Sequence, residues 1–274
     1  MKKKVIYCLL SLLMIILYGC SQESKSSQKN EKKEPSVSLT DKDKKETAME
    51  LVSSAENSSL NWKKQYSYIE DIKDGRGYTA GIIGFCSGTG DMLEVVKNYT
   101  QEQPDNKLAK FLPALKKVNG SDSHEGLGVE YEQAWKEASK DPVFQKAQNK
   151  IRDRDYFKPA VKLAKKDGLS VLGQFIYYDA IVMHGPGDGS VPADQSFFGI
   201  RKTAMAAYKT PAQGGNEKKY LTVFLDKRDK VMHMEDAHDD LSRTQAQRKF
   251  LKEKSYDLNK PLKFKMYGDP FEIK

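Results

Sequence analysis

Cysteine is scarce in this chain of 274 residues, which holds only three. Cys8 lies in the apolar N-terminal stretch and Cys20 directly after it, so Cys86 is the one cysteine in the rest of the chain. This count excludes a fold held together by disulfides within its globular part. Cys86 lies in an apolar run, where we expect a small buried side chain rather than a thiol nucleophile.

The apolar stretch at the N-terminus, residues 5–18, follows three lysines and is too short to span a bilayer comfortably. The segment from Leu17 to Cys20 resembles the cleavage motif of bacterial lipoproteins. We therefore predict a lipoprotein-type signal peptide over residues 1–19, lipidation of Cys20, and export to the cell surface or the medium. Secretion without lipidation and a retained anchor are the alternatives. A lipid at Cys20 is the one membrane contact that we expect.

Large apolar side chains are almost missing from residues 20–45, which consist mainly of Ser, Lys, Glu, Asp and Gln. Such a segment cannot bury enough surface to offset the entropy lost on ordering, so we predict a disordered tether. Its lysines are matched by acids, which excludes a polybasic membrane arm. Regular apolar patterning over residues 46–274 predicts one domain with its own core, divided into two lobes.

The formal net charge of +8 suggests nucleic-acid binding at first sight. Three of these charges belong to the predicted signal peptide, and no block of basic residues interleaved with aromatics occurs. The other Lys and Arg residues alternate with acids along the predicted helices, as on a solvated surface. We therefore expect no nucleic-acid partner, and a monomer is the default.

Apolar residues recur at helical spacing along most of the globular part. The first helix is predicted from Ala48 to about Asn57, and Asp91 with Glu94 fits the N-cap and capping box of the next. Further helices are predicted over residues 108–118, 131–138, 143–151, 156–165, 169–183, 197–207, 220–232 and 242–252. Because residues 169–183 are apolar almost all round, they should form the buried central helix.

Strand patterns are few in this sequence. Residues 66–69 and 78–85 alternate or run apolar with glycines between them, which predicts a small antiparallel sheet with a hairpin turn at Asp74 and Gly75. Residues 262–264 and 270–273 suggest a short extended finish. The predicted fold class is therefore α+β, predominantly α-helical, with one small sheet near the N-terminal side.

Two acidic residues fit the hydrolysis of a glycosidic bond, which needs an acid for the leaving oxygen and a second carboxylate. Glu56 ends the first helix beside apolar residues such as Leu51 and Ala55, where partial desolvation would raise its pKa and keep a proton available. Asp74 lies in a polar turn, should stay ionised, and suits the role of a base. From the residues alone, Glu56 could equally be a surface residue, and Asp-Gly is a common hairpin turn.

Three other motifs resemble phosphate, calcium or zinc sites but lack the spacing that such sites require. Residues 75–81 imitate a phosphate-binding loop, but the last Gly is mis-spaced and no helix follows directly. Residues 235–240 are acidic, yet they lack the alternating ligands and central Gly of a calcium loop. His184, His233 and His238 form no pair at the spacing of a helical zinc site. We expect no metal and no cofactor.

Several motifs in collinear order resemble the chitosanases of glycoside hydrolase family 46. These motifs are SSAENSSL, YIEDIKDGRGYTAGIIGFCSGTGD, FLPALKKVNG, GQFIYYDAIVMHGPG and IRKTAM, with shorter matches at residues 224–228 and 238–243. The likeness covers essentially residues 46–273. It implies a lysozyme-like, two-lobed fold with the sheet beside the cleft, and endo-acting, inverting hydrolysis of β-1,4 bonds between glucosamine units of chitosan.

By this resemblance, Glu56 is the general acid, Asp74 the general base, and Thr79 a hydroxyl residue that helps to hold the attacking water. Because inversion needs room for that water, the two carboxyl groups should stand about 6.5–9.5 Å apart. The same likeness makes Asp91 a residue that binds a substrate amine, and the N-cap role given above can coexist with it.

The resemblance also assigns a supporting ion network to Asp179, Arg228 and Arg243. An aspartate in an apolar helix must be paired in any case, because an unpaired buried charge is very costly. The remaining substrate contacts implied by the likeness are Arg76, Tyr68, Tyr156, His184, Glu235 and Asp239. Carboxylates suit this substrate, because protonated amines of chitosan donate charge-assisted hydrogen bonds to them.

Two other functions stay open on the sequence. A muramidase would share the fold, but its acetylated glycan has no cation to pair with Asp91, Glu235 and Asp239. A lipoprotein that only binds an aminosugar polymer would not need a complete catalytic set. Residues 188–194 form a loop that looks expanded relative to the family pattern, which would reshape one edge of the cleft.

Overall fold

The computed structural model describes residues 37–187, 191–234 and 240–274. Its helices are α1 (Lys42–Asn57), η1 (Trp62–Ser67), α2 (Asp91–Glu102), η2 (Ala109–Phe111), α3 (Leu112–Val118), α4 (Val129–Ala138), α5 (Pro142–Arg152), η3 (Asp153–Phe157), α6 (Lys158–Lys166), α7 (Val171–His184), α8 (Phe197–Ala207), η4 (Pro211–Gln213), α9 (Glu217–Met232) and α10 (Ser242–Lys252). Its strands are β1 (Ile69–Glu70), β2 (Thr79–Ala80), β3 (Phe85–Cys86), β4 (Leu262–Met266) and β5 (Asp269–Ile273).

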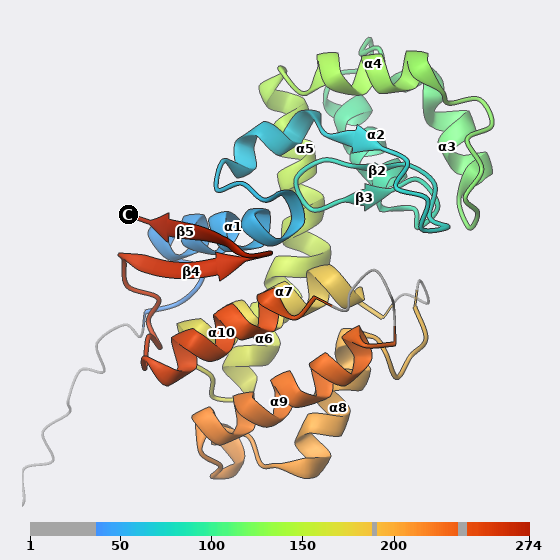
Figure 1. Ribbon diagram of the computed structural model, residues 1–274. Coiled ribbons are helices and arrows are strands. Elements are labelled where there is room, and N and C mark those ends of the chain that lie inside the picture. The colour runs from blue at the N-terminus through green and yellow to red at the C-terminus, as the bar shows by residue number, and fades with distance from the viewer. Residues whose placement is uncertain (1–36, 188–190, 235–239) are drawn as a thin grey trace, which may run out of the picture. The chain divides into compact units, whose positions relative to one another are not determined.

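The described part of the chain is mostly helical, with two small antiparallel sheets, which confirms the predicted fold class. Figure 1 shows the sheet β1–β3 grouped with α2 to α5, and a second group formed by α6 to α10; we call these groups the upper and lower lobes. Packing contacts between α2 and α5 hold the upper lobe, and contacts between α8 and α9 and between α6 and α7 hold the lower one. The division into two lobes matches the sequence prediction.

Helix α7 is the central helix that the sequence predicted. Twelve of its fourteen residues are buried, and α1, η3, α6, α8 and α10 all pack on it. Ser170 caps its N-terminus, because its side chain accepts a hydrogen bond from the backbone N–H of Gly173. Its position fixes Asp179 in the interior of the lower lobe.

Packed structure is already present before residue 46, the boundary that composition predicts. Helix α1 starts at Lys42. Leu39 is fully buried, and its backbone N–H donates to the side-chain oxygen Oε1 of Gln174 on α7 over 2.9 Å. Lys45 forms an ion pair of 2.6 Å with Asp153. The last residues of the predicted tether are therefore held by contacts with distant parts of the chain, which local composition does not reveal.

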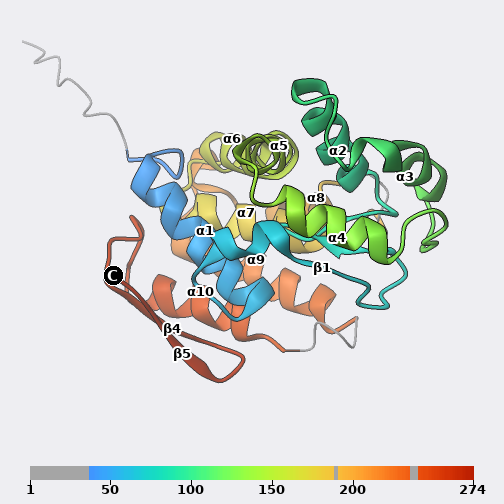
Figure 2. The ribbon, with the colours of Figure 1, turned by 90° about the horizontal axis from the view of Figure 1, so that it is seen from above.

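Helices α5, η3 and α6 follow one another without a break and form one helical run from Pro142 to Lys166 that passes from the upper lobe to the lower one (Figures 1 and 2). Its middle segment, η3, is a π-helix rather than the helix start that the sequence predicted at Tyr156. Insertions of this kind are common at functional sites. The segment carries Tyr156 toward the sheet side of the molecule, as its contacts below show.

The predicted sheet is present as three strands of two residues each, in the order β1-β2-β3. Thr79 on β2 pairs with Glu70 on one side and with Cys86 on the other. Asp74 and Gly75 lie in the connection between β1 and β2, as predicted, and Gly75 adopts a left-handed φ of 82°. Within the described ranges, no helix combines the length and apolar character needed to cross a membrane.

Candidate active site

A cavity of about 600 Å³ collects most of the residues that the sequence singled out. Its lining residues include the carboxyl groups of Glu56, Asp74 and Asp91 and the hydroxyl group of Thr79. Four others are Arg76, Tyr156, His184 and Arg243. The cavity is therefore formed by the end of α1, the small sheet, the start of α2, η3, the end of α7 and the start of α10.

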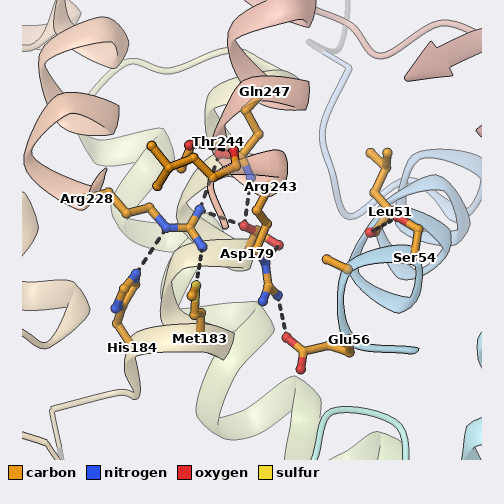
Figure 3. Close-up of polar contacts among 12 residues, drawn as sticks. Leu51, Ser54, Glu56, Asp179, Met183, His184, Arg228, Arg243, Thr244 and Gln247 are labelled. Atoms are coloured by element: carbon orange, nitrogen blue, oxygen red, sulfur yellow. Dashed lines mark hydrogen bonds and ion pairs between the residues drawn. The ribbon is translucent and has the colours of Figure 1, made fainter. Parts of the chain in front are cut away.

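Glu56 lies in the last turn of α1 with its side chain 29% exposed. Residues 51–55 of the helix are all buried, and Glu56, four residues after Val52, is the first exposed residue after them, at the edge of the buried face. The Oε1 atom of Glu56 accepts a hydrogen bond from the guanidinium Nη2 of Arg243 (Figure 3). One carboxyl oxygen is thus held by the protein, and Oε2 remains for chemistry in the cavity.

Arg243 links Glu56 to a buried aspartate behind the cavity. Asp179 Oδ1 accepts from Arg243 Nε over 3.0 Å, and Oδ2 accepts from Arg228 Nη1 over 2.6 Å (Figure 3). Burial raises the pKa of Asp179, but the charges of Arg243 and Arg228 outweigh it and hold this pKa at about 2. Asp179 is therefore an anion that compensates two buried guanidinium groups.

The network has a member that the sequence analysis missed. Gln247 donates from Nε2 to Asp179 Oδ2 over 2.7 Å and is almost fully buried. It lies four residues after Arg243 on α10 and so on the same helical face, a spacing that could have revealed it. His184 belongs to the same cluster, because its Nε2 accepts from Arg228 Nε over 3.1 Å.

Asp74 is held by the side chain and the backbone of Arg76. Its Oδ1 accepts from the Arg76 N–H over 3.1 Å, and its Oδ2 accepts from Arg76 Nε over 2.8 Å and from Nη2. Together these hydrogen bonds, two to Oδ2 and one to Oδ1, orient the carboxylate within an exposed turn. Arg76 lines the cavity, where the resemblance predicts a substrate contact, and it is also the partner of Asp74.

Thr79 occupies the middle strand of the small sheet, with 8% of its surface exposed. The Sγ atom of Cys86 lies 3.6 Å from Thr79 Oγ1 and donates to the carbonyl of Gly84 over 3.3 Å. Burial raises the pKa of Cys86 to about 11, so the thiol is neutral. Cys86 is thus the small buried side chain that the sequence predicted.

Asp91 is not the N-cap of α2. The helix begins at Asp91 itself, and Gly90, with a left-handed φ of 88°, is the capping residue. The Oδ1 atom of Asp91 instead accepts three hydrogen bonds, from the backbone N–H groups of Cys86 and Met92 over 2.8 Å and from Thr89 Oγ1 over 2.9 Å. The predicted capping box is therefore wrong, because the carboxylate closes the loop before α2 rather than the helix end.

The second oxygen of Asp91 connects the upper lobe to the π-helix. Tyr156 donates its hydroxyl to Asp91 Oδ2 over 2.8 Å. Burial raises the pKa of Asp91, although the hydrogen bond from Tyr156 and those at Oδ1 act in the opposite direction. Oδ2 accepts this one hydrogen bond whereas Oδ1 accepts three, so Oδ2 is the less occupied oxygen and can take a further donor.

The remaining predicted residues lie in other places. Tyr68 is outside the cavity lining, and its hydroxyl donates to Glu70 Oε2 over 3.3 Å. Burial and the charges of nearby carboxylates, Glu56 and Asp74 among them, raise the pKa of Tyr68. Cys20, Glu235 and Asp239 lie outside the described residues, as do residues 188–190 of the loop that looked expanded. Val191, Pro192 and Gln195, from the described part of that loop region, line the cavity.

Among the residues that the structure describes, no group of three or more His, Cys, Asp and Glu side chains is placed to hold a metal ion. The chemistry available in the cavity is thus that of one carboxyl group held by an arginine, a second carboxylate held by another arginine, and a hydroxyl between strands. Such a set fits acid–base hydrolysis.

Comparisons with known proteins agree with this picture. The family model of glycosyl hydrolase family 46 matches residues 50–262. The chain is similar to a chitosanase of a Streptomyces species, at 66% identity over 236 residues that cover 86% of this chain and 84% of the relative. A solved chitosanase complex is 52% identical, with a TM-score of 0.84, and covers 87% of this chain and 100% of its own. A chitosanase of Gynuella sunshinyii in complex with chitotetraose is 34% identical, with a TM-score of 0.77, covering 84% and 97%.

Proposed function

The chain belongs to glycosyl hydrolase family 46 and is a glycoside hydrolase with the lysozyme-like fold of that family, and from this premise we propose that it is an endo-acting, inverting chitosanase. The observation that supports the proposal best is the pair of carboxyl groups in one cavity. Glu56 reaches it from a helix end and Asp74 from a strand turn, each oriented by an arginine.

Glu56 acts as the general acid in this proposal. Because Arg243 donates to Oε1, that oxygen serves as the carbonyl oxygen of a protonated carboxyl group, and the proton is carried on Oε2. Oε2 delivers this proton to the glycosidic oxygen as the bond to the anomeric carbon breaks. Asp179 keeps Arg243 in place from behind, so that the acid is held in one orientation.

Asp74 acts as the general base. It takes a proton from a water molecule as the water oxygen attacks the anomeric carbon from the face opposite the leaving group. The hydroxyl of Thr79 helps to hold that water. The configuration at carbon 1 is therefore inverted, with one water consumed and one new reducing end formed per cleavage.

The substrate class follows from the relatives and from the charge of the cavity. Relatives that share most of this chain carry the name chitosanase, and one was solved with chitotetraose. Asp91 has acceptor capacity left on Oδ2, which suits the ammonium group of a glucosamine unit. Tyr68, Arg76, Tyr156 and His184 stay predicted substrate contacts, as do Glu235 and Asp239.

We also propose export of the chain through its N-terminal segment, with a lipid at Cys20 or with secretion after cleavage. The folded part works as a monomer in this proposal. Both statements rest on the sequence alone.

The proposal predicts rapid release of reducing ends from highly deacetylated chitosan. The length of the polymer chains should fall early, before short oligomers accumulate, because cleavage is internal. Reducing-end assays and product sizing on the purified protein measure this, with chitin, partly acetylated chitosan and bacterial cell walls as parallel substrates. Clearing of cell walls without cleavage of chitosan would instead establish a muramidase. Binding of chitosan without any release of reducing ends would show a binding protein and contradict the assignment.

A further inference from the structure

The hairpin formed by β4 and β5 has no part in the proposed chemistry, yet it contacts the helix that carries Glu56. Strand β5 packs against α1, and β4 packs against α10 (Figure 1). At the turn between the strands, Tyr267 donates its hydroxyl to the backbone carbonyl of Ala55 over 2.9 Å. This contact joins residues 212 positions apart in the sequence, and Ala55 directly precedes Glu56.

The acceptor of this bond is a carbonyl group at the end of a helix. Helix α1 ends at Asn57, and Ser58 turns the chain with a left-handed φ of 47°. The last carbonyl groups of a helix lack an intrahelical amide partner and need other donors. Within the described residues, the hydroxyl of Tyr267 is that donor for Ala55. The hydrogen bond therefore fixes the turn of backbone from which Glu56 projects.

The backbone of Tyr267 adopts a conformation that is unfavourable for a tyrosine. Tyr267 and Gly268 have φ values of 51° and 88°, as in the tight turns with two left-handed residues that usually carry Asn and Gly. A bulky side chain is rare in this region of φ. Such positions persist where the surroundings over-determine them and gather at functional sites. The side chain is also 46% exposed, so burial alone does not explain a tyrosine here.

Tyr267 is also close to the charged groups of the site. Burial raises the pKa of its phenol, Arg243 opposes this rise, and Glu56 adds to it. The phenol thus stays protonated and able to donate wherever chitosan amines carry charge. Arg243 and Tyr267 hold Glu56 from two directions, one at its carboxyl group and the other at the backbone before it.

We propose that Tyr267 is a positioning residue for Glu56: its hydroxyl holds the last turn of α1 so that Glu56 stays aligned with Arg243 and the cavity. The inference rests on the proposed role of Glu56 as the acid. It gives the C-terminal hairpin a function in catalysis, although neither strand lines the cavity that holds the two carboxyl groups.

Tyr267→Phe keeps the ring and removes the hydroxyl, so it tests the hydrogen bond alone. We expect kcat on a glucosamine hexamer to fall roughly threefold to tenfold, as the loss of one hydrogen bond allows, with KM unchanged within about twofold. Tyr267→Asn is the second variant, because Asn tolerates a left-handed φ but cannot reach Ala55. It should remain folded by circular dichroism and lose at least as much kcat.

Tyr99→Phe is the matched control. It also removes a tyrosine hydroxyl from a hydrogen bond, here to Asp141 over 2.7 Å, but in the upper lobe and away from the cavity. Its kcat should equal that of the wild type even if its thermal stability falls. Equal losses of kcat in Tyr99→Phe and Tyr267→Phe would show a general effect of stability and overturn the inference.

An unchanged kcat in Tyr267→Phe would also overturn it, and so would a rise in KM without a change in kcat, which would indicate a substrate contact. Glu56→Gln is assayed beside these variants. If Glu56→Gln keeps full activity, the proposed function fails. If Glu56→Gln is inactive while both Tyr267 variants behave as the wild type, only the positioning role fails.

Discussion

Glu56→Gln is expected to lower kcat on chitosan by roughly a hundredfold to ten-thousandfold, the range over which general acids contribute. The amide is nearly the same size as the carboxyl group and still offers an oxygen to Arg243, so the position of the side chain should be kept. It has no proton to give to the leaving oxygen. Reducing-end assays measure turnover, and calorimetric titration with a glucosamine hexamer should show affinity close to that of the wild type.

Glu50→Gln provides the matched control for this variant. Glu50 lies on the same helix α1, is paired with Lys260 at 3.5 Å, and does not line the cavity. The substitution makes the same replacement of a carboxyl group by an amide and should leave kcat within about twofold of the wild type. High activity in Glu56→Gln would remove Glu56 from the mechanism, and equal losses in both variants would point to a general effect on α1.

Asp179→Asn is expected to lower the free energy of unfolding by about 3–5 kcal/mol, because it leaves Arg228 and Arg243 buried without their shared anion. Urea unfolding at neutral pH measures the loss. Asp105→Asn, at an exposed position with no ion pair among the described contacts, should change stability by less than about 0.5 kcal/mol. A loss below about 1 kcal/mol in Asp179→Asn would contradict the burial and pairing of this carboxylate.

Asp179 also leads to a prediction about the stability of the protein at low pH. The pKa of Asp179 is held at about 2 in the folded protein, below its ordinary value of 3.8. Its ion pairs therefore stabilise the fold fully above about pH 4, and this stabilisation, about 2 kcal/mol, is lost as the pH falls toward 2. Asp179→Asn has no such group, so its stability should fall less steeply between pH 4 and 2 than that of the wild type.

Much of the fold could be predicted because the signals are local. The apolar run of residues 169–183 indicated a buried helix, and α7 covers Val171–His184. The Asp-Gly pair between two apolar stretches indicated the hairpin connection of the small sheet. Asp179 had to be paired once it was placed in that buried helix, and the structure supplies two arginines and Gln247.

Other features depend on contacts between distant parts of the chain. Leu39 is buried against α7, although its neighbours have the composition of a disordered segment. The carboxylate of Asp91 closes a loop and meets Tyr156 from a π-helix, an arrangement that helical periodicity does not predict. Tyr267 reaches Ala55 across 212 positions, and only the folded chain brings them together.

The configuration of the first products tests the central claim, that Glu56 and Asp74 act on opposite faces of the sugar ring. NMR spectra recorded immediately after mixing the protein with a glucosamine hexamer distinguish the two anomers before they interconvert. Because the cleaved bond is β, inversion predicts that the new reducing ends appear first as the α-anomer. First products in the β configuration would contradict the account, because retention requires a carboxylate that attacks the sugar itself rather than a base that activates water.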